Sequence, residues 1–345
     1  MIKKICIVYI ILLAIISIFA YFFIPDNSRN ANQMHLPIHS LSPGFSVDML
    51  ILKNTDESYQ SSFNRLFFGE INSNTEIPLQ NYTLKGNKLL YNEYGIVSEE
   101  YNQELIIDQI DSKNFVQNNI VNKTYLLGTD KFGRDVLSRI VLGTRISFFI
   151  GFVSVFISLL IGIILGSIAG YYSGFVDKII MWLINVTWSI PTLLLVIAIT
   201  LALGKGIWQV FIAVGITMWV DVARVVRGQV ITVKERQFVK AARILGFSDL
   251  RIITKHIFPN IVSPLIIISA ANFAAAILIE SGLSFLGLGA QPPTASWGSI
   301  IKDHYNYLII GKPILALIPG FCIMTLVTAF MLLGNKLRDQ LDVKW

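Results

Sequence analysis

The chain has 345 residues, of which 54% are hydrophobic and 14% are charged, and its formal net charge is +6. Soluble proteins carry about 25% charged residues. This composition therefore excludes a soluble globular domain and predicts a membrane protein.

Long uncharged runs predict how often the chain crosses the membrane. A helix that spans the hydrocarbon needs about 20 apolar residues. The sequence contains six such runs, at residues 5–25, 146–176, 179–204, 206–220 with its flanks, 257–279 and 313–335. We therefore expect an all-α membrane protein with six transmembrane helices.

The first run follows Lys3 and Lys4. It is longer than the roughly 7 to 15 apolar residues of a signal peptide, and no small-x-small cleavage site follows it. We therefore expect residues 1–25 to form an uncleaved transmembrane anchor. With Lys3 and Lys4 in the cytoplasm, six spans place the basic loop around Ala241 and both termini in the cytoplasm.

Residues 26–127 predict a small β-rich extracytoplasmic domain. This segment has twelve acidic and seven basic residues, so its net charge is negative. Apolar residues alternate with polar ones at residues 45–51, as on a half-buried strand. Gly86-Asn87 separates two short runs, 82–85 and 88–91, and predicts a hairpin turn. Its function stays open between contact with a binding protein and a passive surface domain.

A polar motif precedes the second run. Its members are Gly128, Thr129, Asp130, Gly133, Arg134 and Asp135. The glycines allow turns, and Asp130 or Asp135 can pair with Arg134 or Arg139. We favour a structural clamp at the membrane surface over a substrate contact.

Three features of the runs predict helix packing. Gly162, Gly166 and Gly170 recur at intervals of four, which lets helix backbones approach closely. Pro191 should kink the third span. At the end of the fourth span, residues within helical reach predict an interfacial ion-pair cluster; they are Asp221, Arg224 and Arg227.

The loop at residues 224–262 carries eight Lys and Arg residues against two acids. Residues 234–245 predict a helix that Gly246 ends with a left-handed cap. Ser248 can cap a second helix, and Pro259 should push Phe258 out of the helical region. Ala241 and Ala242 should lie at the tip of this helix-turn-helix and admit another surface. A DNA-binding helix-turn-helix and a plain cytoplasmic loop are the alternatives.

Lys240-Ala241-Ala242, Gly246 and His256-Ile257-Phe258-Pro259 have the spacing of a known motif. They resemble the loop by which permeases of ATP-binding cassette importers contact their ATPases. Lys240, His256 and Phe258 replace the usual glutamate, isoleucine and leucine, and the histidine is similar to the dipeptide and oligopeptide branch. The resemblance implies an ATPase-coupling role for Lys240, Ala241, Ala242, Arg243, Gly246, Phe247, Ser248, Asp249 and Pro259.

Further segments extend this resemblance over residues 128–342. They are residues 128–139, 143–147, 280–289, 293–298 and 333–342. The resemblance implies that residues 128–345 form a type I permease core with five transmembrane helices. A second permease subunit, two ATPase subunits and an extracytoplasmic solute-binding protein would be its partners.

Glu280 is the acid that stands out within apolar surroundings. Exposure to lipid at mid-membrane would cost roughly 2.5 to 3.5 kcal/mol, so Glu280 should face the bundle interior or lie near the outer interface. A place on the translocation path and a structural role are both open for Glu280, Ser281 and Ser284.

Other chemistry is not indicated. Cys6 and Cys322 fall in separate spans, and the four histidines have no ligand spacing, so we expect neither a disulfide nor a metal site. The chain contains no GxxxxGK[ST] motif. We therefore expect no enzymatic activity and no bound cofactor, with ATP and Mg²⁺ used by the partner ATPase.

The sequence thus predicts a permease subunit in a bacterial inner membrane, surrounded by lipid and without nucleic acid. Peptides are the favoured cargo, and a nickel chelate or another small solute is the alternative. Two other classes stay open: a membrane-anchored regulator that binds nucleic acid, and a channel that works alone.

Overall fold

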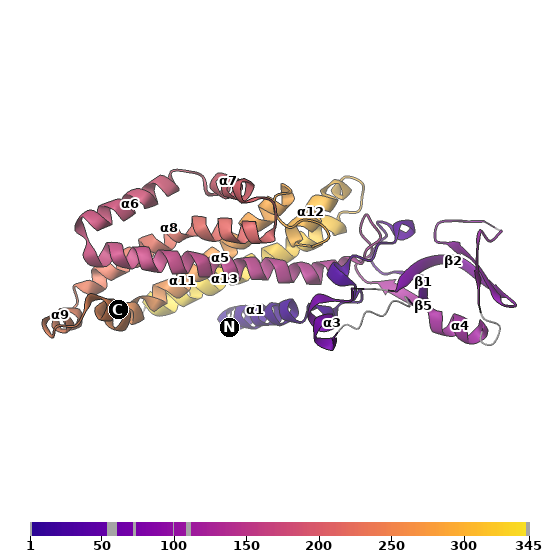
Figure 1. Cartoon of the computed structure of the whole chain (residues 1–345), viewed down its shortest axis with the longest axis horizontal. Coiled ribbons are helices and arrows are strands. Elements are labelled where there is room, and N and C mark those ends of the chain that lie inside the picture. Colours follow the sequence, from indigo (N-terminus) through magenta and orange to yellow (C-terminus); the bar gives the residue numbers. More distant parts are fainter. Residues whose placement is uncertain (1, 54–60, 72–73, 99, 108–111, 343–345) are drawn as a thin grey trace.

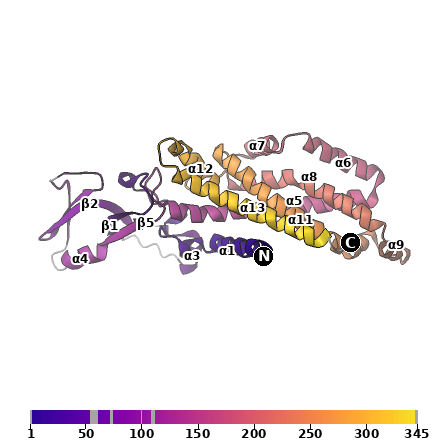
Figure 2. The same cartoon turned by 180° about the vertical axis from the view of Figure 1, so that it is seen from behind.

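The computed structural model describes residues 2–53, 61–71, 74–98, 100–107 and 112–342. These residues form an elongated molecule, with a helical bundle along most of its length and a β-sheet at one end (Figure 1). The described C-terminus lies towards the opposite end, beside α9, and α6 and α7 lie along one side of the bundle (Figures 1 and 2).

The helices of the bundle are long and apolar. Four segments are long and apolar enough to cross a membrane: α5 (Val136–Tyr172), α8 (Ile207–Lys234), Asp249–Phe285, which includes α11 (Phe258–Phe285), and Ile314–Gln340 of α13 (Ile314–Asp342). A fifth crossing results if α6 (Gly174–Trp188) and α7 (Thr192–Leu203) count as one span. The helical prediction is confirmed, whereas these lengths do not establish six spans.

The predicted first span forms a helix too short to count among these crossings. Helix α1 (Ile2–Ile18) has 17 residues, and a short helix, α2 (Ala20–Phe23), follows it. Tyr9 and Thr325 join α1 to α13 through a hydrogen bond of 2.8 Å between their hydroxyls. The first run therefore packs on the bundle.

Helices α5 and α8 meet along the predicted glycine stripe. A Cβ on Gly166 would lie 2.5 Å from the carbonyl oxygen of Ala223, and one on Gly170 would lie 2.8 Å from that of Arg227. A Cβ on Gly162 would likewise lie 2.9 Å from the carbonyl oxygen of Trp219, one turn of α8 before Ala223. The stripe is therefore a backbone-to-backbone contact, as its spacing predicts.

Pro191 interrupts the predicted third span, whereas a kink within one helix was expected. The chain breaks between α6 and α7, and the two helices are bent by 90°. Pro191 stands at the N-cap of α7 with extended torsions (φ −54°, ψ 125°). Because proline has no amide hydrogen, it begins the new helix and does not continue the old one.

Pro259 does not end a helix, so that prediction is wrong. Phe258 has helical torsions (φ −53°, ψ −47°), and Pro259 lies in the first turn of α11. A π-helical segment, Ile252–Ile257, comes directly before it. Its wider turn relieves the clash of the proline ring with the preceding carbonyl groups, so that the helix continues.

The sheet has five antiparallel strands in the order β4-β3-β2-β1-β5. The strands are β1 (Phe45–Leu52), β2 (Thr75–Lys85), β3 (Lys88–Glu93), β4 (Gln103–Ile106) and β5 (Ile120–Tyr125). The predicted strand is β1, and the predicted hairpin joins β2 to β3 with Lys85 opposite Lys88. Two short helices, α3 (Ser62–Phe68) and α4 (Ser112–Asn119), complete this part of the chain.

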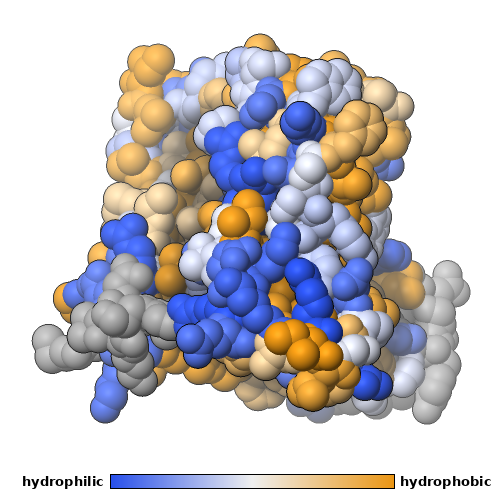
Figure 3. All heavy atoms as spheres, turned by 90° about the vertical axis from the view of Figure 1, so that its left-hand side faces the viewer, coloured by the Kyte–Doolittle hydropathy of each residue, from blue (hydrophilic) through white to orange (hydrophobic). Residues whose placement is uncertain are grey.

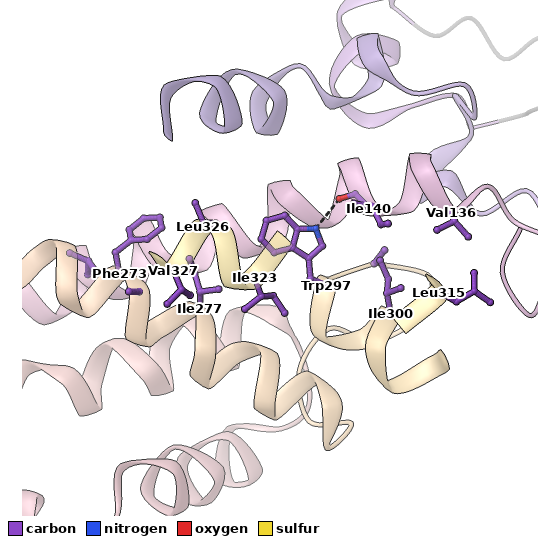
Figure 4. Packing of buried hydrophobic residues seen from close by; sticks show 13 residues of the cluster. Val136, Ile140, Phe273, Ile277, Trp297, Ile300, Leu315, Ile323, Leu326 and Val327 are labelled. Atoms are coloured by element: carbon purple, nitrogen blue, oxygen red, sulfur yellow. Dashed lines mark hydrogen bonds between the residues drawn. The ribbon is translucent and has the colours of Figure 1, made fainter. Parts of the chain in front are cut away.

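A buried cluster joins α5, α11 and α13 to α12 (Trp297–His304). Trp297 is 1% exposed, and its indole nitrogen donates a hydrogen bond of 3.0 Å to the carbonyl oxygen of Ile140 (Figure 4). Phe273, Ile277 and Leu326 belong to the same cluster. This core holds the short helix α12 against the bundle.

The α5–α8 contact can be tested with Gly166→Ala. The added methyl group collides with backbone atoms of α8, so we expect a loss of about 1–3 kcal/mol in the free energy of unfolding. Gly228→Ala is the matched control, because a Cβ there meets no atom within 4 Å. Both changes gain the same helix propensity. Denaturant titration in mild detergent measures the difference, and equal stability of the two variants would contradict this packing.

Candidate functional site

The segment between α8 and α11 forms a helical hairpin at the end of the bundle away from the sheet. It contains α9 (Gln237–Ile244) and the short helix α10 (Asp249–Arg251). Gly246 has a φ of +76°, its amide donates to the carbonyl of Arg243 at 3.0 Å, and the amide of Phe247 donates to that of Ala242 at 3.2 Å. These two bonds close α9 with the predicted left-handed glycine cap.

Ser248 does not cap the second helix with its side chain. It occupies the N-cap position of α10, but its hydroxyl accepts no hydrogen bond from the following amides. The residue is exposed, so water can satisfy the free amides at this helix start. The predicted side-chain cap is wrong, although the helix begins where it was expected.

Ala242 is turned inward. It is 4% exposed and belongs to a buried cluster with Val239, Ile252 and Ile257. The expectation that Ala242 admits another surface is therefore wrong, because this face of α9 packs on the π-helical segment. Ala241, on the other side of the helix, is exposed.

Three large apolar side chains of the hairpin are more than two-thirds exposed. Ile244 is 86% exposed, Leu245 is 73% exposed and Leu250 is 72% exposed. We call these three residues the apolar tip. Figure 3 views this end of the molecule and shows hydrophilic residues over much of it, with a small hydrophobic group among them. Apolar groups exposed together mark interaction surfaces.

The hairpin is tied to the end of α5. The Tyr171 hydroxyl donates to a carboxylate oxygen of Asp249 at 2.7 Å, and the Lys234 ammonium donates to the Tyr171 carbonyl at 2.6 Å. Arg243 lies over the Tyr171 ring, 5.4 Å from its centre. Lys240 makes an exposed pair with Glu235 at 3.0 Å. Movement of the hairpin would therefore be transmitted to α5.

The predicted cluster of Asp221, Arg224 and Arg227 is wrong, because α6 supplies nearer partners. Arg227 forms two hydrogen bonds to Asp177 of α6, at 2.5 and 2.7 Å. Arg224 stacks on the Trp188 ring, 3.5 Å from its centre. Helical spacing places these residues on one face, but the neighbouring helix decides their partners.

At the sheet end, the 128–135 motif fastens α5 to the segment that precedes the sheet. Thr129 accepts a hydrogen bond of 2.9 Å from the amide of Leu41. Gly128 and Gly133 have φ of +76° and +72°, and a side chain on either would collide with a carbonyl group. Asp135 caps α5 by accepting the Ser138 amide at 2.8 Å.

Asp130 is the centre of this motif. One oxygen accepts the amides of Phe132 and Arg134 at 2.8 and 2.9 Å, and the other accepts the Arg134 guanidinium at 2.6 Å. Arg139 approaches the same carboxylate at 3.6 Å. Asp130 and both arginines are buried. The single negative charge of Asp130 therefore offsets part of the positive charge of Arg134 and Arg139.

Three titratable groups near the motif have shifted pKa values. Burial raises the pKa of Asp135, although hydrogen bonds from Ser138 oppose this effect. Burial also acts to raise the pKa of Glu76, but a hydrogen bond from His35 and the Lys123 charge outweigh it, so the net shift is downward. Burial lowers the pKa of His304. The junction therefore favours an ionised Glu76 and a neutral His304.

Glu280 faces the bundle interior, one of the two predicted places, and is 2% exposed. Its Oε1 accepts a hydrogen bond of 2.6 Å from the Ser284 hydroxyl, which itself accepts bonds from the Ala290 amide and the Ser296 hydroxyl at 3.2 Å. Within the described residues, its Oε2 and the buried Ser281 hydroxyl have no hydrogen-bond partner. This geometry ties α11 to the loop before α12.

The hairpin, the 128–135 motif and Glu280 lie in different parts of the molecule and do not form one site. Among the residues that the structure describes, no three His, Cys, Asp or Glu side chains gather closely enough to hold a metal ion.

Residues 162–341 match the family model described as "Binding-protein-dependent transport system inner membrane component". The chain is 42% identical over 220 residues to the oligopeptide permease OppC of Salmonella typhimurium, covering 64% of this chain and 72% of that protein. It is 37% identical over 267 residues to the dipeptide permease DppC of Alkalihalophilus pseudofirmus, covering 76% and 88%.

A third relative is the glutathione permease GsiD of Pectobacterium atrosepticum, at 39% identity over 238 residues, covering 68% of this chain and 79% of that protein. The chain belongs to this family of inner-membrane transport components. It is therefore a permease component of a transport system.

Asp130→Ala tests the clamp. Removing this carboxylate leaves Arg134 and Arg139 as buried cations without their partner, so we expect a loss of about 3–5 kcal/mol in the free energy of unfolding in detergent. Asp303→Ala is the control, because Asp303 and Lys131 form a partly exposed pair at 2.9 Å, for which about 0–1 kcal/mol is expected. Similar losses in the two variants would refute a clamp centred on Asp130.

Proposed function

We propose that this chain is the permease subunit of an ATP-binding cassette importer that carries di- or oligopeptides into the bacterial cell. The relatives are named for the transport of oligopeptides, dipeptides and glutathione. All three cargoes are peptides, which supports a peptide substrate here. Nothing in the described residues favours a nickel chelate over a peptide.

In this proposal the chain crosses the membrane six times. Residues 1–25 are the anchor, residues 26–127 are an extracytoplasmic insertion, and residues 128–345 are the permease core with five spans and the cytoplasmic loop 224–262. The excess of cations in that loop favours the cytoplasm. The Lys3 ammonium donates to the Gln340 side chain at 2.6 Å, which supports placing both termini on that same side.

The observation that carries the coupling role is the apolar tip. Its three side chains are exposed at the end of a hairpin that is itself packed firmly on the bundle. An apolar surface on a hairpin that also carries Lys240, Arg243 and Arg251 fits a groove on a cytoplasmic ATPase. The remaining residues of the predicted coupling set shape and orient the hairpin, while Ala241 and Arg243 flank the tip.

The chain itself is not catalytic in this proposal. Two ATPase subunits bind ATP and Mg²⁺, a second permease subunit completes the translocation path, and an extracytoplasmic binding protein delivers the peptide. Closure of the ATPases would push the hairpin, and the contacts of Tyr171 with Asp249 and Lys234 would carry that movement to α5.

Ile244→Asp combined with Leu245→Asp tests the coupling role. Charges at the apolar tip would be buried without partners on docking, so we expect at least a tenfold loss of co-purifying ATPase and of peptide uptake. Because both side chains are exposed, the permease should keep its thermal stability in detergent. Affinity purification with quantitative mass spectrometry measures the association.

Val97→Asp is the matched control for this experiment, because Val97 is 91% exposed and lies in the 26–127 segment. This variant should retain the ATPase and the uptake. Normal ATPase recovery with the tip variant would rule out the hairpin as the docking element.

A further inference from the structure

A cavity of about 170 Å³ lies beside the break between α6 and α7. Thr187 and Trp188 at the end of α6 line it, together with Thr192 at the start of α7. Asp221 of α8 and Asn272 of α11 also line it, each near the midpoint of a 28-residue helix. Transporters commonly build their substrate sites next to broken helices.

Asp221 brings a negative charge to this cavity. Its Oδ1 accepts a hydrogen bond of 3.2 Å from the Trp188 indole. Among the described residues, Arg227 is paired with Asp177. Arg224 stacks on the Trp188 ring, 3.5 Å from its centre, and its buried Nε donates no hydrogen bond, to Asp221 or to any other described group. A partly buried carboxylate is stabilised by a nearby cation, and a cationic ligand can supply one.

Asn272 brings a hydrogen-bond donor. The residue is 4% exposed, and its side-chain nitrogen has no acceptor among the described residues. The hydroxyls of Thr217 and Thr187 already donate to carbonyls of their own helices, both at 2.9 Å, so they offer only acceptor oxygens to a ligand. A carbonyl oxygen in the cavity would satisfy Asn272.

The size of the cavity limits what it can hold. Pockets that enclose a whole small-molecule ligand measure roughly 300–1,000 Å³, so this one accepts only part of a peptide. Its wall combines an anion, acceptor oxygens and one amide donor with apolar side chains such as Met218 and Leu195. This combination matches a primary ammonium followed by a carbonyl group.

We propose that this cavity is a subsite for the amino-terminal residue of a transported peptide. Asp221 pairs with the ammonium group, and Asn272 donates to the first peptide carbonyl oxygen. The subsite rests on the proposed function, that is, on peptide transport by this chain with its partner subunits.

Asp221→Asn tests the ion pair, because asparagine keeps an acceptor for Trp188 and removes only the charge. Uptake of trialanine and of N-acetyl-trialanine is measured in vesicles that contain the whole transporter. We expect the variant to reduce trialanine uptake about tenfold and N-acetyl-trialanine uptake less than twofold. The preference of the binding protein is common to both transporters, so it cancels in this comparison.

Asp339→Asn is the matched control, since this exposed carboxylate pairs with Lys336 far from the cavity, and it should change neither uptake. An equal reduction for the two peptides with Asp221→Asn would overturn the subsite while leaving peptide transport intact.

Loss of the second permease subunit from the variant would also overturn the subsite, because Asp221 would then pair across the subunit interface. A wild-type transporter that takes up no trialanine would overturn the peptide cargo, and the subsite with it.

A second measurement does not depend on the Asp221 variant. Ala275 lines the same cavity, and a cysteine there can be labelled with a maleimide in a chain whose Cys6 and Cys322 are replaced by serine. Trialanine should slow this labelling in the purified complex without binding protein, and N-acetyl-trialanine should not. If labelling is equally fast without peptide, with trialanine and with N-acetyl-trialanine, the proposal is overturned.

Discussion

The structure depends on the close contact between α5 and α8. Glycines on α5 leave no side chain between the two helices, so carbonyl oxygens of α8 lie against the α5 backbone. Within a membrane, helices gain little from burying apolar surface against one another, and close backbone approach becomes the main source of attraction. This contact fixes α8, and α8 in turn supports the hairpin at one end and Asp221 in its middle.

The same pair of helices links the two ends of the molecule. Helix α5 begins at the buried Asp130–Arg134 clamp and ends at Tyr171, which binds Asp249 of the hairpin. The hairpin is held by a buried cluster that runs from α9 into α8 and α11. A force applied to the apolar tip would therefore reach the bundle as a movement of packed helices, since close-packed interiors transmit displacement.

Sequence reasoning succeeded where the signal was local. The cap at Gly246, the strand at residues 45–51 and the hairpin at Gly86-Asn87 follow from backbone preferences of a few residues, and so does the interruption at Pro191, which is a break where a kink was expected. It failed where a neighbouring helix decided the outcome. Arg227 pairs with Asp177 of α6 and not with Asp221. The helix continues through Pro259 because a π-helical segment precedes it.

The exposed surface of the hairpin shows the same division. The motif spacing located the hairpin, but it singled out Ala242, which is buried, and did not indicate that Ile244, Leu245 and Leu250 are exposed. The glycine cap beside Ile244 and Leu245 was a usable signal, because residues at a helix end that protrudes from a bundle have few neighbours to cover them.

The sequence by itself determined the membrane class, the positions of the apolar helices, the turn and cap residues, and the family. These properties depend on composition and on contacts between residues near in the chain. The tertiary structure alone decided which face of α9 is exposed, which partner each buried charge finds, and that Asp221 and Asn272 share a cavity. Those outcomes depend on how helices that are far apart in the sequence pack against one another. The conformational preferences of neighbouring residues do not specify that packing.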